Sequence, residues 1–189
     1  LRLPTPGDRS YGTFKGKDKD FNIVGLGESP MAGVGITKNS LTLTGLTAVR
    51  LNKLLDCNVN WKIMAKSGLS LKKLNNLIRL QSYENPDLVL VSMGGNDVFN
   101  LTPPWVWKKN VNICINYFFQ NEKKPLILFS SVPPVGRFPA IPSPLSIVFG
   151  LWGFLLQASL IQAVNSMDNV YLLEARFPQG NEYYLEDGI

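Results

Sequence analysis

A serine stands in a glycine-rich turn directly after an apolar run near the start of the chain. Residues 21–26 form the apolar run, and Gly27, Glu28 and Ser29 follow it. Small neighbours let a substrate approach both a hydroxyl and the surrounding backbone N–H groups, as a nucleophilic serine requires. A dinucleotide-binding fingerprint would need a glycine where Pro30 stands, and no Gly-Lys-Ser/Thr ending of a phosphate-binding loop follows. The segment indicates Ser29 as a candidate nucleophile, with an ordinary turn as the alternative.

A second small-residue loop follows the apolar residues 59–65. It contains Ser67, Gly68 and Ser70. Because Gly68 has no side chain, its backbone N–H can come close to a ligand. The alternative is a helix N-terminus that Ser67 or Ser70 caps.

A third loop follows residues 87–91 and contains Gly94, Gly95, Asn96 and Asp97. The short amide of Asn96 could donate a hydrogen bond to an oxyanion that develops during acyl transfer. The alternative is an Asn-Asp turn in which Asp97 caps the helix that follows.

The elements that must position these loops alternate between short apolar runs and stretches of helical period. The predicted strands are residues 21–26, 59–65, 87–91, 126–129 and 170–173, and the predicted helices are residues 40–56, 69–81, 103–119 and 145–165. Continuously apolar strands joined by helical crossovers predict a parallel sheet that helices cover on both faces. Loops at the carboxyl ends of its strands would then form the site.

The length and composition of the chain fit one domain. The chain has 189 residues, of which 45% are hydrophobic and 17% charged, with a net charge of +5. Residues 1–20 carry no apolar period and are predicted to be a leader or linker before a domain over residues 21–189. The lysines are dispersed and nucleic-acid binding is not expected. Cys57 and Cys114 lie among apolar residues, which favours buried thiols over a disulfide framework or a metal site.

One predicted helix is unusually apolar. Residues 145–164 approach the length of a membrane span, but Gly150, Gly153, Gln157 and Gln162 interrupt the apolar pattern. We expect a helix that packs on the sheet. An outer face that meets lipid or an acyl chain is the sharper alternative.

Together the three loops resemble the SGNH hydrolases, also called GDSL-like esterases and lipases. The resemblance lies in Gly27-Glu28-Ser29 with Gly33, in Gly68, and in Gly94-Gly95-Asn96-Asp97. It implies a flavodoxin-like three-layer α/β/α sandwich with a five-stranded parallel sheet. It also implies that Ser29 is the nucleophile and that the Ser29 N–H, the Gly68 N–H and the Asn96 amide stabilise the oxyanion. Glu28 departs from the family, which most often has Asp at this position.

The resemblance also implies an Asp followed three residues later by a catalytic His. The matching acid is Asp187, which would place the histidine one residue beyond Ile189, and the 189 residues contain no histidine. A helix after residues 170–173 is also missing. We therefore expect a domain that is incomplete at its C-terminus, with a serine that lacks its general base.

The expected function is ester hydrolysis through an acyl-serine intermediate, without a metal or organic cofactor. Lipid-like or other acyl esters are the expected substrates, in a lysophospholipase, thioesterase or carboxylesterase. The alternatives are a carbohydrate O-acetylesterase, a non-catalytic binding module of the same fold, and a flavodoxin-like cofactor binder. Peripheral membrane contact is expected as a partner interaction. Oligomeric state and compartment stay open, with a membrane-associated or periplasmic location through a segment upstream of Leu1 as one option.

Overall fold

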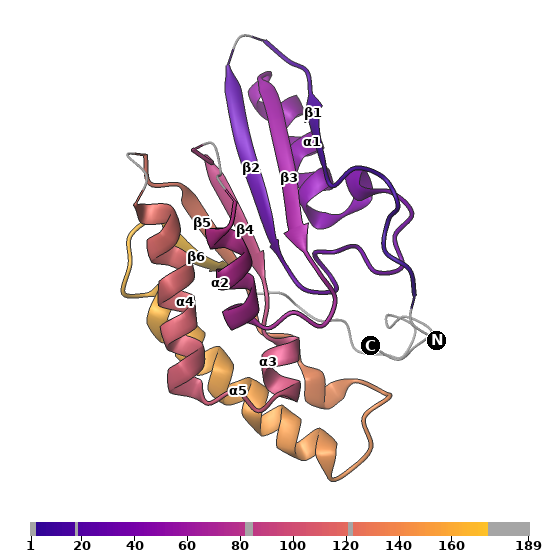
Figure 1. The fold of residues 1–189 in the computed structure, drawn as a ribbon, viewed down its shortest axis with the longest axis vertical. Coiled ribbons are helices and arrows are strands. Elements are labelled where there is room, and N and C mark those ends of the chain that lie inside the picture. Colours follow the sequence, from indigo (N-terminus) through magenta and orange to yellow (C-terminus); the bar gives the residue numbers. More distant parts are fainter. Residues whose placement is uncertain (1–2, 18, 82–84, 121–122, 174–189) are drawn as a thin grey trace.

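Six strands form one sheet at the centre of the computed structural model, which describes residues 3–17, 19–81, 85–120 and 123–173. Figure 1 shows the sheet with helices on its faces. The strands are β1 (Tyr11–Phe14), β2 (Asp20–Gly27), β3 (Asn58–Ala65), β4 (Leu88–Ser92), β5 (Leu126–Ser130) and β6 (Val170–Leu173), in the order β1-β3-β2-β4-β5-β6. Strands β2 to β6 are parallel. The predicted α/β fold class and all five predicted strands are confirmed.

The strand count of five was too low, because β1 pairs antiparallel with the outer edge of β3. It lies inside the segment that was predicted to be a leader. Its contacts come from β3: the Thr13 hydroxyl donates to Asn60 Oδ1 at 2.7 Å, and the Phe14 ring stacks on Trp61 at 6.4 Å. Four residues among Gly, Lys and Asp carry no periodic signal of their own, so only the free edge of β3 makes them a strand.

The four predicted helices are present with slightly different ends. They are α1 (Leu43–Leu55), α2 (Leu71–Arg79), α4 (Pro104–Phe119) and α5 (Leu145–Val164). The structure adds a short helix, α3 (Gly95–Phe99), and the 3-10 turns η1 (Asn39–Leu41) and η2 (Val135–Arg137). These three segments are too short to show a helical period in the sequence.

The helices form two layers with the sheet between them. On one face, Ala48 of α1 packs with Val59 and Leu90. On the other face, α2, α4 and α5 pack over a larger cluster that includes Phe118 and Leu156. All of β4 is buried, as expected for a strand covered on both sides.

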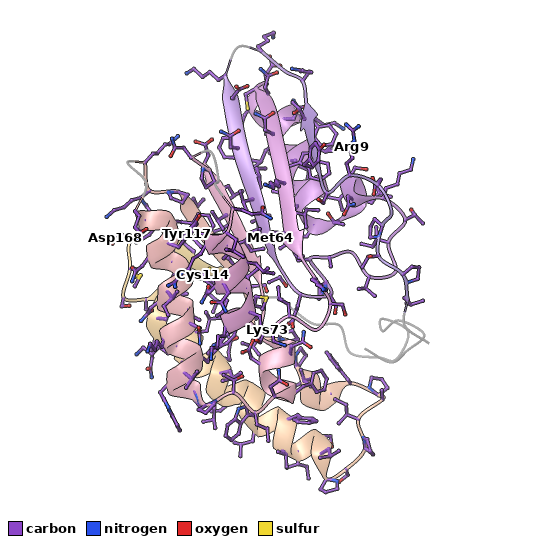
Figure 2. All side chains as sticks on the ribbon, viewed as in Figure 1. Arg9, Met64, Lys73, Cys114, Tyr117 and Asp168 are labelled. Carbon is purple, nitrogen blue, oxygen red and sulfur yellow. The ribbon has the colours of Figure 1, made fainter. Side chains whose placement is uncertain are left out.

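Both cysteines are buried free thiols, as predicted. Cys114 lies on α4 (Figure 2), and burial raises the pKa of its thiol to about 12. A thiol of such high pKa is a poor nucleophile and serves as a small core side chain.

Helix α5 has two different faces. Its inner face, which includes Gly153, Leu156 and Leu160, is buried against the sheet side of the molecule. Its outer face exposes large apolar side chains, among them Leu151 and Phe154. By length and composition alone α5 is apolar enough to cross a membrane. Its inner face nevertheless belongs to the core, as the expectation of a helix packed on the sheet requires.

The order of strands fixes where a ligand can bind. The chain leaves β2 for β3 on one side, and the next strand, β4, pairs with β2 on the other side. Crossovers in opposite directions open a crevice at the carboxyl end of the strand between them. Ser29 follows β2, so it lies at this switch point.

Leucine-to-alanine substitutions on the two faces of α5 should change the free energy of unfolding by different amounts. Leu156 is 0% exposed and Leu151 is 59% exposed. Leu156→Ala should lower the free energy of unfolding by about 2–4 kcal/mol, because it leaves a cavity in the core. Leu151→Ala should change it by less than about 0.5 kcal/mol. Urea denaturation followed by circular dichroism measures both, and similar losses would contradict the two-faced helix.

Candidate active site

Three loops leave the sheet at the same level. Gly27 at the end of β2 pairs with Ala65 of β3 and with Ser92 of β4. Ser29, Ser67 and Gly94 each lie two residues beyond this level. Parallel strands are about 4.8 Å apart, so the three loops emerge side by side. The structure therefore brings together the three loops that the sequence singled out.

The turn after β2 holds Ser29 close to the sheet. The Ala32 N–H donates to the Glu28 carbonyl at 2.8 Å, and the Val34 N–H donates to the Ser29 carbonyl at 3.2 Å. Gly27 allows the turn to fold back, because a Cβ there would lie 2.4 Å from the Met31 Cβ. Ser29 is half-buried at the edge of this turn.

The Ser29 hydroxyl has one side-chain partner among the described residues. Its Oγ lies 2.9 Å from the Ser67 Oγ. Ser67 is thus not the cap of α2, and Ser70, which occupies the N-cap position, makes no side-chain capping bond. Sequence reasoning missed the Ser67 contact, although a serine two residues past the neighbouring strand was the available signal.

Within the described parts of the chain, neither the Ser29 N–H nor the Gly68 N–H has a hydrogen-bond acceptor. Gly68 is exposed and has a φ of +80°, a conformation that glycine adopts without strain. Backbone N–H groups in such positions can donate to a bound anion.

Glu28 ties the first loop to the third. Its buried carboxylate accepts from the Gly95 N–H at 2.6 Å, from the Asn96 N–H at 2.9 Å, and from the Asn96 side-chain amide. Burial raises the pKa of Glu28. The three hydrogen bonds lower this pKa, and the nearby charge of Asp97 adds to the rise.

The bond to Glu28 uses one of the two N–H groups on Asn96 Nδ2. The second N–H stays available, because an amide nitrogen carries two donors. Asn96 is partly exposed, so this N–H can meet a ligand. Glu28, whose side chain is longer than the Asp that the family most often has here, therefore orients Asn96 and leaves one N–H of the Asn96 amide free to donate.

Asp97 links the third loop to the second. The Leu71 N–H at the start of α2 donates to Asp97 Oδ2 at 2.9 Å, and the Thr102 hydroxyl donates to Oδ1 at 3.1 Å. The expectation that Asp97 caps the following helix was wrong, because it caps α2, which precedes it in the chain. Burial raises the pKa of Asp97.

These contacts bring a hydroxyl and three N–H donors, from Ser29, Gly68 and Asn96, onto adjacent loops. Among the described residues, no group of three or more His, Cys, Asp or Glu could hold a metal ion. Asp187, the fourth predicted site residue, lies outside the described residues.

Asp97 offers a test of this loop linkage. An Asn at position 97 can accept from Leu71 and donate to the Thr102 hydroxyl, so Asp97→Asn keeps both bonds. Asp97→Ala leaves the Leu71 N–H without an acceptor and should lower the free energy of unfolding by about 1–3 kcal/mol.

The two variants should also differ in their pH dependence. Since the folded-state pKa of Asp97 is raised above 3.8, the wild-type protein loses stability as pH rises from 3.8 through that pKa. Asp97→Asn removes this loss and should be at least as stable as wild type at pH 7. Urea denaturation from acid to neutral pH measures the effect, and a less stable Asn variant at neutral pH would contradict it.

Comparisons with known proteins agree with this geometry. The sequence model of the GDSL-like Lipase/Acylhydrolase family matches residues 23–186. No curated protein sequence matches the chain.

Solved structures share the fold at low identity. A serine-to-alanine mutant of the esterase AlinE4 has a TM-score of 0.64 and 17% identity, and the match covers 83% of this chain and 77% of that one. The lipase Lip_vut3 from a goat rumen metagenome has a TM-score of 0.60 and 16% identity, with coverages of 80% and 79%. The esterase EstA from Pseudoalteromonas sp., inhibited by monoethylphosphonate, has a TM-score of 0.57 and 16% identity, with coverages of 82% and 76%.

These structures establish the fold, and the family match spans most of the chain. Ser29 follows β2 at the switch point, with the loops of Gly68 and Asn96 on either side, and these are the three loops on which the sequence resemblance rests. The chain therefore belongs to the GDSL-like lipase/acylhydrolase family, the SGNH hydrolases.

Proposed function

We propose that the chain is an ester hydrolase in which Ser29 attacks the ester carbonyl. The observation that supports this proposal is that the Ser29 hydroxyl contacts Ser67, in the loop that also carries the Gly68 N–H, and that neither the Ser29 N–H nor the Gly68 N–H has an acceptor among the described residues. An arrangement of this kind stabilises charge that develops only in the transition state, which is how a site accelerates acyl transfer.

The reaction would have two steps. The Ser29 Oγ loses its proton and bonds to the carbonyl carbon, and the resulting oxyanion accepts hydrogen bonds from the Ser29 N–H, the Gly68 N–H and the Asn96 amide. Collapse of this intermediate expels the alcohol, which takes up a proton, and leaves an acyl-serine. Water then attacks the acyl group, releases the acid and restores the hydroxyl.

The proton acceptor for Ser29 is a separate proposal. The 189 residues contain no histidine, and the neighbouring Ser67 hydroxyl is a poor base. The sequence resemblance assigns this role to a histidine paired with Asp187, so the base for Ser29 would have to come from outside these 189 residues.

The substrate is proposed to be an acyl ester with an apolar chain. An open cleft of about 520 Å³ lies between η2 and α5, lined among others by Val132, Phe149 and Phe154. Val132 packs near Gly94, in the loop that carries Asn96. Apolar walls beside the proposed oxyanion donors suit an acyl chain better than a sugar.

Ser29 can be tested with a fluorophosphonate, which reacts with nucleophilic serines. Added imidazole should accelerate labelling of the 189-residue chain, because it supplies the missing base. Ser29→Ala should abolish the labelling, whereas Ser70→Ala, in the neighbouring loop, should label like wild type. Mass spectrometry identifies the modified residue. Equal labelling of Ser29→Ala, or no labelling with imidazole, would remove Ser29 as the nucleophile.

Asn96 can be tested against a second asparagine at the end of the same helix. Loss of one oxyanion donor typically costs on the order of a hundredfold in rate, so Asn96→Ala should slow imidazole-assisted labelling by about that factor. Asn100 is exposed and follows α3, and Asn100→Ala should leave the rate within about twofold. Labelling reactions quenched at a series of times give both rates. An unchanged rate in Asn96→Ala would contradict the role of Asn96 as an oxyanion donor.

A further inference from the structure

The outer face of α5 is a continuous apolar stripe. We define it by Ile147, Leu151, Phe154 and Ile161, whose successive spacings of four, three and seven residues place them on one side of the helix. The first three are 59% to 69% exposed. Trp105, in the first turn of α4, is 74% exposed. A stripe of this size on one helix is more than the single exposed apolar residues that ordinary surfaces carry.

Basic residues accompany this face, and acidic ones are almost absent from the same stretch of chain. Between Asp97 and Asp168 the sequence contains one acidic residue, Glu122, and five basic ones, namely Lys108, Lys109, Lys123, Lys124 and Arg137. Asp168 follows the C-terminal end of α5 (Figure 2).

Two of the basic residues lie on elements that pack against α5. The Lys108 Nζ donates to Gln162 Oε1 at 3.2 Å, near the end of the helix. Arg137 is exposed on η2, whose Gly136 packs against the backbone of Ser146 and Gly150 near the start of the helix. Positive charge therefore lies near both ends of α5.

The other side of α5 lies beside the candidate active site. Helix α3 begins with the loop that carries Asn96 and ends at Phe99, and Figure 1 shows it next to α5. The Phe99 ring meets Phe149 of α5 edge to face at 5.3 Å. Phe149 is two residues from Ile147 and Leu151, so it points to the side of α5 opposite the stripe. The helix therefore separates the stripe from the proposed oxyanion donors.

We propose that the outer face of α5, with Trp105 and the flanking basic residues, docks on the surface of an anionic phospholipid bilayer. Apolar side chains would enter the interface while lysine and arginine contact the lipid head groups. The helix lies on the bilayer rather than across it, because its inner face belongs to the protein core. A second copy fits less well, since a symmetric contact would bring basic residues together without acidic partners.

This inference goes beyond ester hydrolysis, and its test does not require a working active site. The 189-residue chain is sedimented with vesicles of phosphatidylcholine plus phosphatidylglycerol, or of phosphatidylcholine alone. We expect binding to the anionic vesicles that weakens at high salt. Ser29→Ala should bind like wild type, so a failure of the proposed hydrolase function would leave this result unaffected.

Matched double variants locate the docking face. Leu151→Asn with Phe154→Asn should weaken vesicle partitioning by about tenfold or more, because two interfacial apolar side chains are lost. Leu54→Asn with Leu80→Asn is the control, since these leucines are 78% and 81% exposed on other parts of the surface. It should bind like wild type. Lys108→Gln with Arg137→Gln should weaken binding to anionic vesicles severalfold and leave any binding to neutral vesicles unchanged.

Other occupants of the face give distinct results that would overturn the proposal. A dimer in size-exclusion chromatography that Leu151→Asn with Phe154→Asn dissociates, without vesicle binding, would assign the face to a second copy. A large loss of unfolding free energy in this variant, again without vesicle binding, would assign it to another part of the same chain. Equal vesicle binding by the α5 variant and the control would place the contact elsewhere.

Discussion

The Glu28 carboxylate is the contact on which the arrangement of the site depends. It leaves the end of β2 and accepts three N–H groups of the loop after β4, so two loops that are 67 residues apart at Glu28 and Gly95 become one unit. Burial of a carboxylate is costly, and only several good donors make it tolerable. The three donors act against the rise that burial causes in its pKa, and the charge of Asp97 adds to that rise. Glu28 thus holds Asn96 through both its backbone N–H and its side-chain amide, and Glu28 directly precedes Ser29.

Asp97 extends this unit to the second loop, which follows β3. Its carboxylate accepts the first N–H of α2, directly after the Ser67–Gly68 turn, and so fixes that turn relative to Asn96. The two buried acids thus join all three loops at the carboxyl edge of the sheet. Rigid supports of this kind allow donors to be aimed before a substrate arrives, which is the basis of electrostatic preorganisation. Asn96 and Asp97 are adjacent in the chain but bond in different directions, Asn96 to Glu28 in the first loop and Asp97 to the start of α2.

Helix α5 packs into the core on one face and is exposed to solvent on the other. Its inner face fills the core beneath α3 and α4, while its outer face shows apolar side chains to solvent. The helix is apolar all round because each face has its own reason to be apolar. Packing explains the inner face, and the proposed bilayer contact explains the outer one. Helix α3, which carries Asn96, packs on the inner side of α5 through the contact of Phe99 with Phe149.

The five parallel strands, the four long helices and the three small-residue loops could be predicted from the amino-acid sequence, because these features repeat over enough residues or rest on residue types with few alternatives. Apolar runs such as Leu88–Ser92 can only be buried strands in this context. The residues that support the loops could not be predicted and became visible only in the folded chain. The capping of α2 by Asp97, the contact of Ser67 with Ser29 and the three bonds to Glu28 join residues 26 to 68 positions apart. The edge strand β1 likewise exists because β3 offers it a partner. Such contacts leave no local pattern, since their energy comes from chain segments that meet only in the folded protein.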